Sequence, residues 1–301
     1  MHPNLDGFHH LGLISSAFSA TIERYECLGF AFTPLSLPEF AMHPGETPQP
    51  VGVGNRTAIF RGHYLEVLGI FDRARWAAFP LESRGPYDLD QPLSRYEGMH
   101  VMHFGTDDLD AVRERLLRQG TPCSEIKPYQ REVDTPNGFC KMRARVMHFP
   151  SGADPEGLLQ IAQHLTPELV LQPRFMHHGN GAIAITEAIV CATDPVAIVA
   201  KYERYTGHAS RIAGKLHIVD MGHSRIVVAT PDDIPEAVPG YVPSVVPSLV
   251  GFTVATSSLD TAADVLERAR IPYAEHRGRL VVSGKEASGS AVVFEPEGAN
   301  R

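Results

Sequence analysis

The chain has 301 residues, a formal net charge of −8, 43% hydrophobic residues and 21% charged residues, a balance typical of a globular protein with room for two ordinary domains. The acidic balance and scattered basic residues argue against a nucleic-acid partner, and no apolar run approaches the roughly 18 residues needed to cross a membrane. Four cysteines without metal-ligand spacing, behind a start that does not resemble an export signal, predict reduced thiols in a cytoplasmic protein.

The first half of the chain is predicted to contain two strand-helix units, each followed by further strands. The expected segments are 7–14, 17–27, 56–60 and 64–68 for the first unit, and 100–105, 108–118, 142–149 and 158–164 for the second. Asp107 or Asp108 is a suitable N-cap for the second helix. Apolar residues recur at helical spacing in that helix, and we expect them to form its buried stripe: Leu109, Val112, Leu116 and Leu117.

Two similar units are predicted in the second half. The expected segments are 185–190, 195–205, 215–221 and 224–229 for the third unit, and 249–254, 259–270, 279–283 and 290–295 for the fourth. Asp194 is the expected cap of the third helix, with Pro195 in its first turn. Because such a unit cannot bury its own apolar face, the four copies must pack together. Consecutive strands after each helix favour mixed, mostly antiparallel sheets, so we predict an α+β fold of four βαβββ modules.

Short motifs in the first half resemble those of the vicinal oxygen chelate superfamily, which includes lactoylglutathione lyase, methylmalonyl-CoA epimerase, extradiol dioxygenases and bleomycin-resistance proteins. The opening strand 8–13 reads FHHLGL, the hairpin 60–68 carries Glu66, and segment 154–160 reads DPEGLLQ. The chain is most similar to the glyoxalase-like domain proteins of that superfamily. The resemblance implies two paired-module domains, which we place at 1–168 and 178–301, with the boundary in the breaker-rich segment 166–180.

In this superfamily two paired modules form an open cup that holds a divalent metal ion. Carried over residue by residue, the resemblance implies His10 and Glu66 as ligands from the first module and Gln160 from the second. Two imidazoles, a carboxylate and an amide would suit Fe²⁺, Mn²⁺, Zn²⁺, Ni²⁺ or Co²⁺. The chain holds enough modules to complete both cups itself, which permits a homodimer without requiring one.

The opening strand of the second module leaves its ligand open between two histidines. Counting places Val101 at the ligand position, with His100 and His103 on either side. We prefer His103, because side chains alternate along a strand and His103 shares a face with Val101; His100 is the second choice. Beside the metal, Arg56 and His100 are the candidate substrate-binding residues, since a guanidinium can bind a carboxylate or phosphate through two hydrogen bonds.

Such a metal polarises a carbonyl or enolate oxygen, and Glu66 is the candidate catalytic group that moves the proton. We therefore predict a divalent-metal-dependent lyase or isomerase that acts on a small oxygenated substrate, meaning a carbonyl, hydroxy-acid or conjugated compound. One alternative is an Fe(II) extradiol-type ring-cleaving dioxygenase, because two histidines and a carboxylate form its ligand triad. The other alternative is a metal-free small-molecule binding or resistance protein.

The second half departs from the ligand pattern. Its opening strands place Glu187 and Gly251 at the positions that correspond to ligands, and one closing strand carries Arg225. Glycine has no side chain to coordinate an ion, and a guanidinium repels one. We therefore predict that the second half binds no metal and serves as a scaffold for the first.

Overall fold

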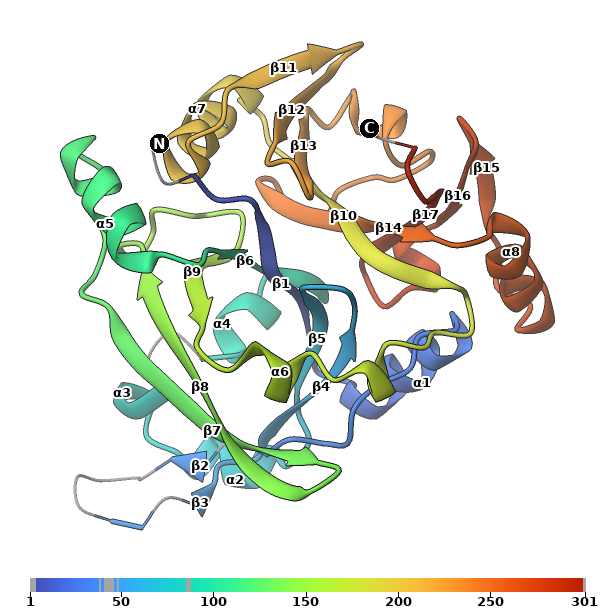
Figure 1. Ribbon diagram of the computed structural model, residues 1–301. Coiled ribbons are helices and arrows are strands. Elements are labelled where there is room, and N and C mark those ends of the chain that lie inside the picture. Colours follow the sequence, from blue (N-terminus) through green and yellow to red (C-terminus); the bar gives the residue numbers. More distant parts are fainter. Residues whose placement is uncertain (1–3, 38, 41–45, 48, 85–87, 300–301) are drawn as a thin grey trace.

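The computed structural model describes residues 4–37, 39–40, 46–47, 49–84 and 88–299, and places two mixed β-sheets side by side (Figure 1). The first sheet has the strand order β4-β5-β1-β6-β9-β8-β7. Its strands are β1 (Gly7–Ser15), β4 (Val53–Ile59), β5 (Tyr64–Ile70), β6 (Gly98–Gly105), β7 (Lys127–Thr135), β8 (Gly138–His148) and β9 (Leu158–His164). The small separate sheet is β2 (Glu39–Phe40) with β3 (Gln49–Pro50).

The second sheet has the order β11-β12-β13-β10-β14-β17-β16-β15. Its strands are β10 (Ala182–Cys191), β11 (Ser210–Ala213), β12 (Leu216–Asp220), β13 (Arg225–Ala229), β14 (Ser248–Thr256), β15 (Ala274–His276), β16 (Arg279–Val282) and β17 (Ala291–Pro296). In both sheets the two opening strands pair antiparallel at the centre, and each also pairs parallel with the last strand of its module. The predicted α+β class with paired modules is confirmed.

Each module carries one longer helix, and short helices fill the connections. The module helices are α1 (Phe18–Cys27), α5 (Leu109–Arg118), α7 (Pro195–Thr206) and α8 (Leu259–Arg268). The short elements are α2 (Arg73–Ala78), α3 (Leu81–Arg84), α4 (Asp90–Leu93), α6 (Pro167–Val170), η2 (Pro173–Phe175), η3 (Ile234–Glu236) and η4 (Gly284–Glu286). Among the described residues, no helix is both long and apolar enough to cross a membrane.

The first module departs from the βαβββ pattern. Modules two to four each have three strands after the helix, whereas the first keeps only β4 and β5 in the main sheet. Where the other modules have a third strand, the described residues beside β4 form a single β-bridge between Ser36 and Asn55. Helices α2 to α4, which the sequence analysis did not predict, connect this module to the second.

The caps of two module helices confirm the sequence expectation, and one buried position contradicts it. Asp108 and Asp194 each accept a hydrogen bond from the backbone amide three residues later, at 3.0 Å. The prediction that Leu117 lies in the buried stripe of α5 is wrong, because its side chain is 45% exposed. Arg115 is buried instead, and its guanidinium donates to two carbonyl oxygens at the end of α7, in the other half.

One hydrophobic core joins the two halves. It includes Leu13 and Phe104 from the first sheet and Phe252 and Phe294 from the second, together with the inner faces of the module helices. The Tyr25 hydroxyl on α1 donates to a backbone oxygen of the fourth module. The division into separate domains at 1–168 and 178–301 stays a prediction. The other face of each sheet has its own packing, and the candidate site lies on that face of the first sheet.

Candidate metal centre

A β-bulge in β1 turns two consecutive histidines toward the same region. Phe8 pairs with Phe104 and His10 pairs with His103, so His9 is an extra residue without its own partner on β6. His9 Nδ1 lies 2.7 Å from His10 Nδ1, which is a hydrogen bond whose donor depends on the tautomers. In a regular strand, His9 would point to the face opposite His10. The bulge instead places His9 within hydrogen-bond distance of His10.

Polar and aromatic side chains form a row across five adjacent strands. In register, His10 lies between Tyr64 of β5 and His103 of β6, and His103 is followed by Gln160 of β9 and His148 of β8. The ring centroids of His10 and His103 are 4.2 Å apart, and the Gln160 amide nitrogen donates to His103 Nδ1 at 2.7 Å. Tyr64 stacks on His10 at 4.6 Å. Three of the four predicted ligands are thus neighbours in one row.

Glu66 completes the predicted ligand set. It lies two residues beyond Tyr64 on β5, on the same strand face, and its carboxylate is 3.7 Å from His10 Nε2. Its side chain is 15% exposed. Burial raises the pKa of Glu66 to about 7, although the positive charge of Arg131 on β7 opposes the shift. A carboxyl group with this pKa can take up and release a proton near neutral pH.

The histidines of this cluster are held in their neutral forms. Burial lowers the pKa of both His10 and His103, and neighbouring histidines lower it further. Burial also lowers the pKa of His9, as do the nearby His164 and His10. A neutral imidazole keeps the lone pair that a metal ion requires.

The described side chains of the cluster are of the types that ligate a metal ion, but they are not arranged as ligands around one ion. Among the described residues, no group of three or more His, Cys, Asp or Glu is arranged to hold a metal ion. The donor chemistry fits a borderline divalent ion, with His10, His103 and Glu66 as ligands. Gln160 would have to turn its amide oxygen toward the ion, because its amide nitrogen now contacts His103.

The two candidate substrate-binding residues lie outside this cluster. Arg56 pairs with Val67, whose side chain belongs to the core beneath the helices, and its guanidinium contacts Glu26 of α1 at 3.0 Å. His100 is buried, and its Nε2 is 2.8 Å from the backbone oxygen of Tyr96. The structure therefore brings together the predicted ligands but neither Arg56 nor His100.

Four further residues of the site were not singled out from the sequence: His9, Tyr64, Arg131 and His164. His164, at the end of β9, stacks on His9 with ring centroids 4.0 Å apart. Burial, followed by the charge of Arg131, lowers the pKa of His164 to about 4. Tyr64 and Arg131 complete the set. Spacing carries a signal for His164, which shares a strand face with Gln160, and for Tyr64, which shares one with Glu66.

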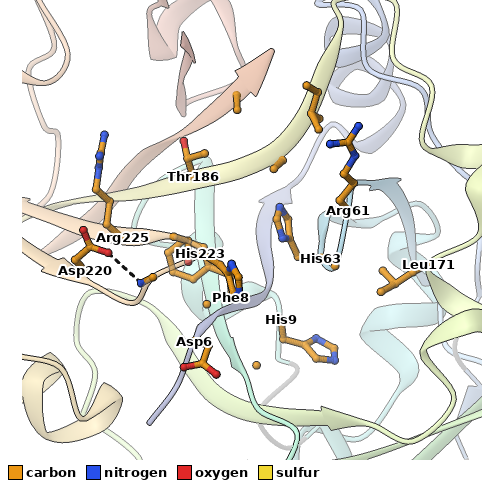
Figure 2. Close-up of a pocket in the computed structure, with 18 of the residues that line it drawn as sticks. Asp6, Phe8, His9, Arg61, His63, Leu171, Thr186, Asp220, His223 and Arg225 are labelled. Atoms are coloured by element: carbon orange, nitrogen blue, oxygen red, sulfur yellow. Dashed lines mark hydrogen bonds between the residues drawn. The ribbon is translucent and has the colours of Figure 1, made fainter. Parts of the chain in front are cut away.

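A cavity of about 720 Å³ adjoins the cluster between the two halves. His9 and His164 line it from the first half, and Ser224 and Arg225 line it from the second. Figure 2 shows His9, His63 and His223 around this space, with Arg225 on the side of the second sheet. Among the described residues, His9 Nε2 and both ring nitrogens of His164 are buried without a hydrogen-bond partner. Polar atoms without partners beside a cavity are consistent with a site that takes a ligand or water.

The corresponding region of the second half is filled. Glu187 lies opposite Arg225 and Thr253, and its carboxylate is bonded to both and to Arg279. Thr253 therefore stands where the sequence analysis placed Gly251, which lies two residues away opposite Ile189. Burial alone would raise the pKa of Glu187, but Arg279 and Arg225 outweigh it and lower the pKa. Aliphatic side chains and η3 occupy the rest of this sheet face.

Comparison with known proteins shows which family the chain resembles. A family model described as a glyoxalase-like domain matches residues 8–206. No curated protein matches the chain. A hypothetical protein from Staphylococcus aureus is 11% identical, with a TM-score of 0.62 over 96% of this chain and 98% of that one.

Two solved enzyme structures share the fold of this chain. The Mn(II)-bound glyoxalase from Novosphingobium aromaticivorans is 13% identical, with a TM-score of 0.53 over 97% of this chain and 82% of that one. A mutant of 4-hydroxymandelate synthase from Streptomyces coelicolor is 11% identical, with a TM-score of 0.55 over 98% and 94%. At these identities the likeness concerns the fold alone. Because the family model covers most of the chain, this protein belongs to the glyoxalase-like domain family.

Proposed function

We propose that the protein is a cytoplasmic, divalent-metal-dependent lyase or isomerase that acts on a small oxygenated substrate. The observation that supports this proposal is the convergence of His10, His103, Glu66 and Gln160 on one face of the first sheet. The structural likeness to the Mn(II)-bound glyoxalase is consistent with the same class of ion.

The ion would be held by His10 and His103, with Glu66 as the charged ligand and Gln160 as the fourth. When bound, it would polarise a carbonyl oxygen of the substrate and stabilise the negative charge that develops when a neighbouring carbon loses a proton. The hydrogen bond between His9 and His10 would orient the ring of His10, as partners of metal-bound histidines commonly do.

Glu66 is the group that we assign to proton transfer. A carboxylate oxygen of Glu66 would accept a proton from the carbon beside the carbonyl group and return it to a neighbouring position. The buried surroundings strengthen its interaction with a charged or polar substrate, because less water screens them. The adjoining cavity offers a small molecule a place to bind next to His9 and His164.

Elemental analysis of protein purified without added metal would test the proposal. We expect one divalent first-row ion per chain, and Glu66→Gln should lower the affinity for it at least about tenfold, since it removes the ligand charge. Glu132→Gln is the matched control, because it makes the same change at an exposed position on β7. Unchanged metal content in Glu66→Gln would reject the assignment.

A second function, an Fe(II) ring-cleaving dioxygenase, is favoured by the ligand types. Two histidines and one carboxylate suit a non-haem iron with open positions, and 4-hydroxymandelate synthase shares the fold. Oxygen uptake with catechol-like compounds separates the two: uptake that depends on Fe²⁺ and on His103 would favour the dioxygenase. A protein without any bound metal would instead favour a binding or resistance function.

A further inference from the structure

Strand β7 places two polar side chains over the cup of the first sheet. In the β7–β8 ladder, Tyr129 lies opposite Ala144 and Arg131 lies opposite Met142. Directly opposed residues of an antiparallel ladder share a face, and both Ala144 and Met142 belong to one buried cluster with Tyr64. Tyr129 and Arg131 therefore point from β7 toward the candidate metal centre.

The charge of Arg131 reaches several groups of the centre. It opposes the burial that raises the pKa of Glu66, and it adds to the burial that lowers the pKa of His10 and His164. Tyr129 is close to the same charges: partial enclosure raises its pKa, Arg131 opposes the rise, and Glu66 adds to it. Since His164 lines the cavity, the field of Arg131 extends from the cluster to that space.

Arg131 has no fixed partner within the part of the chain that the structure describes. Among the described residues, no hydrogen bond or ion pair engages its guanidinium, and none engages the Tyr129 hydroxyl. The side chain of Arg131 is only partly exposed, and that of Tyr129 is 41% exposed, so both line an accessible rim. A partly buried guanidinium without a carboxylate is costly unless something else pairs with it.

Arg225, in the second half, differs from Arg131 because its contacts are those of an arginine with a structural role. Arg225 is buried and bonded to Glu187, so its charge is already neutralised within the protein. Among the described residues, no ion pair joins Arg131 to Glu66, although its charge influences that carboxyl group. Once a divalent ion joins Glu66 and Arg131, positive charge exceeds negative charge in the first cup, which favours an anionic substrate.

We propose that the substrate of this centre carries a carboxylate, and that Arg131 binds it with help from the Tyr129 hydroxyl. The guanidinium offers two parallel N–H donors that match the two oxygens of a carboxylate. The proposal rests on the proposed function, because it takes the anion to be the substrate of the metal centre. It narrows the substrate from an oxygenated compound to an oxygenated acid.

Binding of lactate and lactamide would test it, because they have nearly the same shape and differ in charge. Titration calorimetry on the full chain, with and without Mn²⁺, should show lactate binding at least about tenfold tighter than lactamide. Arg131→Met should weaken lactate binding at least about tenfold and leave lactamide binding unchanged. Arg143→Met is the control, because Arg143 lies on the same hairpin, is exposed and faces away from the cup.

Three results would overturn the proposal. They are equal binding of lactate and lactamide, equal effects of the Arg131 and Arg143 substitutions, and tighter binding of inorganic phosphate than of lactate. The metal assignment is tested separately by the metal content of the Glu66→Gln variant. Binding of lactate that depends on Arg131 in a protein that takes up no metal would uphold the anion site and contradict the proposed function.

Discussion

The two halves of the molecule have similar sheets, but each neutralises a buried carboxylate differently: Glu66 on the closing strand β5 in the first half, and Glu187 on the opening strand β10 in the second. In the first half, Glu66 is a partly buried carboxylate that pairs with no arginine of the described residues, and its pKa is raised to about 7. In the second, Glu187 is bonded to Arg225 and Arg279, and its pKa is lowered. An unpaired buried carboxylate destabilises the fold and is poised for chemistry, whereas a paired one is consistent with a structural role.

The largest expected difference is in stability at pH 7. Glu187→Gln should lower the free energy of unfolding by about 3 kcal/mol, because the buried Arg225 and the partly buried Arg279 then share only the carboxylate of Glu295. Glu66→Gln, the same change in the first half, should stabilise the metal-free protein, because it removes an unpaired buried charge. Urea unfolding of both variants measures this, and equal losses would contradict the comparison.

The pH dependence of stability should have opposite signs at the two carboxylates. Because the pKa of Glu66 rises from 4.5 to about 7 on folding, its contribution is fully present below pH 4.5 and is lost as the pH rises through 7. The loss should approach about 3 kcal/mol in metal-free protein. Glu187 behaves in the opposite way, since its lowered pKa gives stability above pH 4.5 that is lost in acid.

Unfolding experiments from pH 4 to 8, with the corresponding glutamine variants as references, isolate each contribution. The difference between the wild type and Glu66→Gln should be near zero at pH 4 and largest at pH 8. A difference that does not change with pH would show that the Glu66 carboxyl titrates normally.

The contact between the halves should matter somewhat less. Arg115→Met removes the donors to the Arg204 and Tyr205 carbonyl oxygens, and should cost about 2–3 kcal/mol, since hydrogen bonds from a charged group are stronger than average. Because one core joins both sheets, unfolding should remain a single transition. Two separate transitions in the wild type would instead support the predicted division at 1–168 and 178–301.

The smallest expected effect concerns the second-half network itself. Thr253→Val keeps the shape of a fully buried side chain and removes its hydrogen bond to Glu187. We expect a loss of about 1.5 kcal/mol, and no change in metal content. Urea unfolding and elemental analysis of the same sample check both, and a loss of metal would show that the second half does more than support the first.

Repetition made the fold predictable. Four copies of one strand-helix pattern, with aspartate caps before two helices, led to the modules that the structure contains. Helices α2 to α4 were missed because they are only four to six residues long, too short for an apolar period to show. The buried position of Arg115 was also missed, since it depends on carbonyl groups from the other half.

The site was less predictable than the fold. Alternation along β6 was enough to prefer His103, which does lie beside His10. The same alternation places Arg56 on the helix face, but only once its pairing with β5 is known. Arg131 lies on β7, a strand that was not among the predicted segments of the second unit, so its position beside the cup became visible only in the structure.

The bulge at His9 also predicts how the protein tolerates a one-residue deletion. Since Phe8 and His10 already pair with consecutive residues of β6, removal of the single codon for His9 would leave regular pairing at this point with the same neighbours, and the second irregularity, between Gly12 and Leu13, would be untouched. Most one-residue deletions within a strand turn the following side chains to the wrong side of the sheet. Here the deletion would spare the alternation of every other residue of β1 and take away only the imidazole that contacts His10. A scan of single-codon deletions should therefore find an unusually tolerant point inside an otherwise intolerant strand.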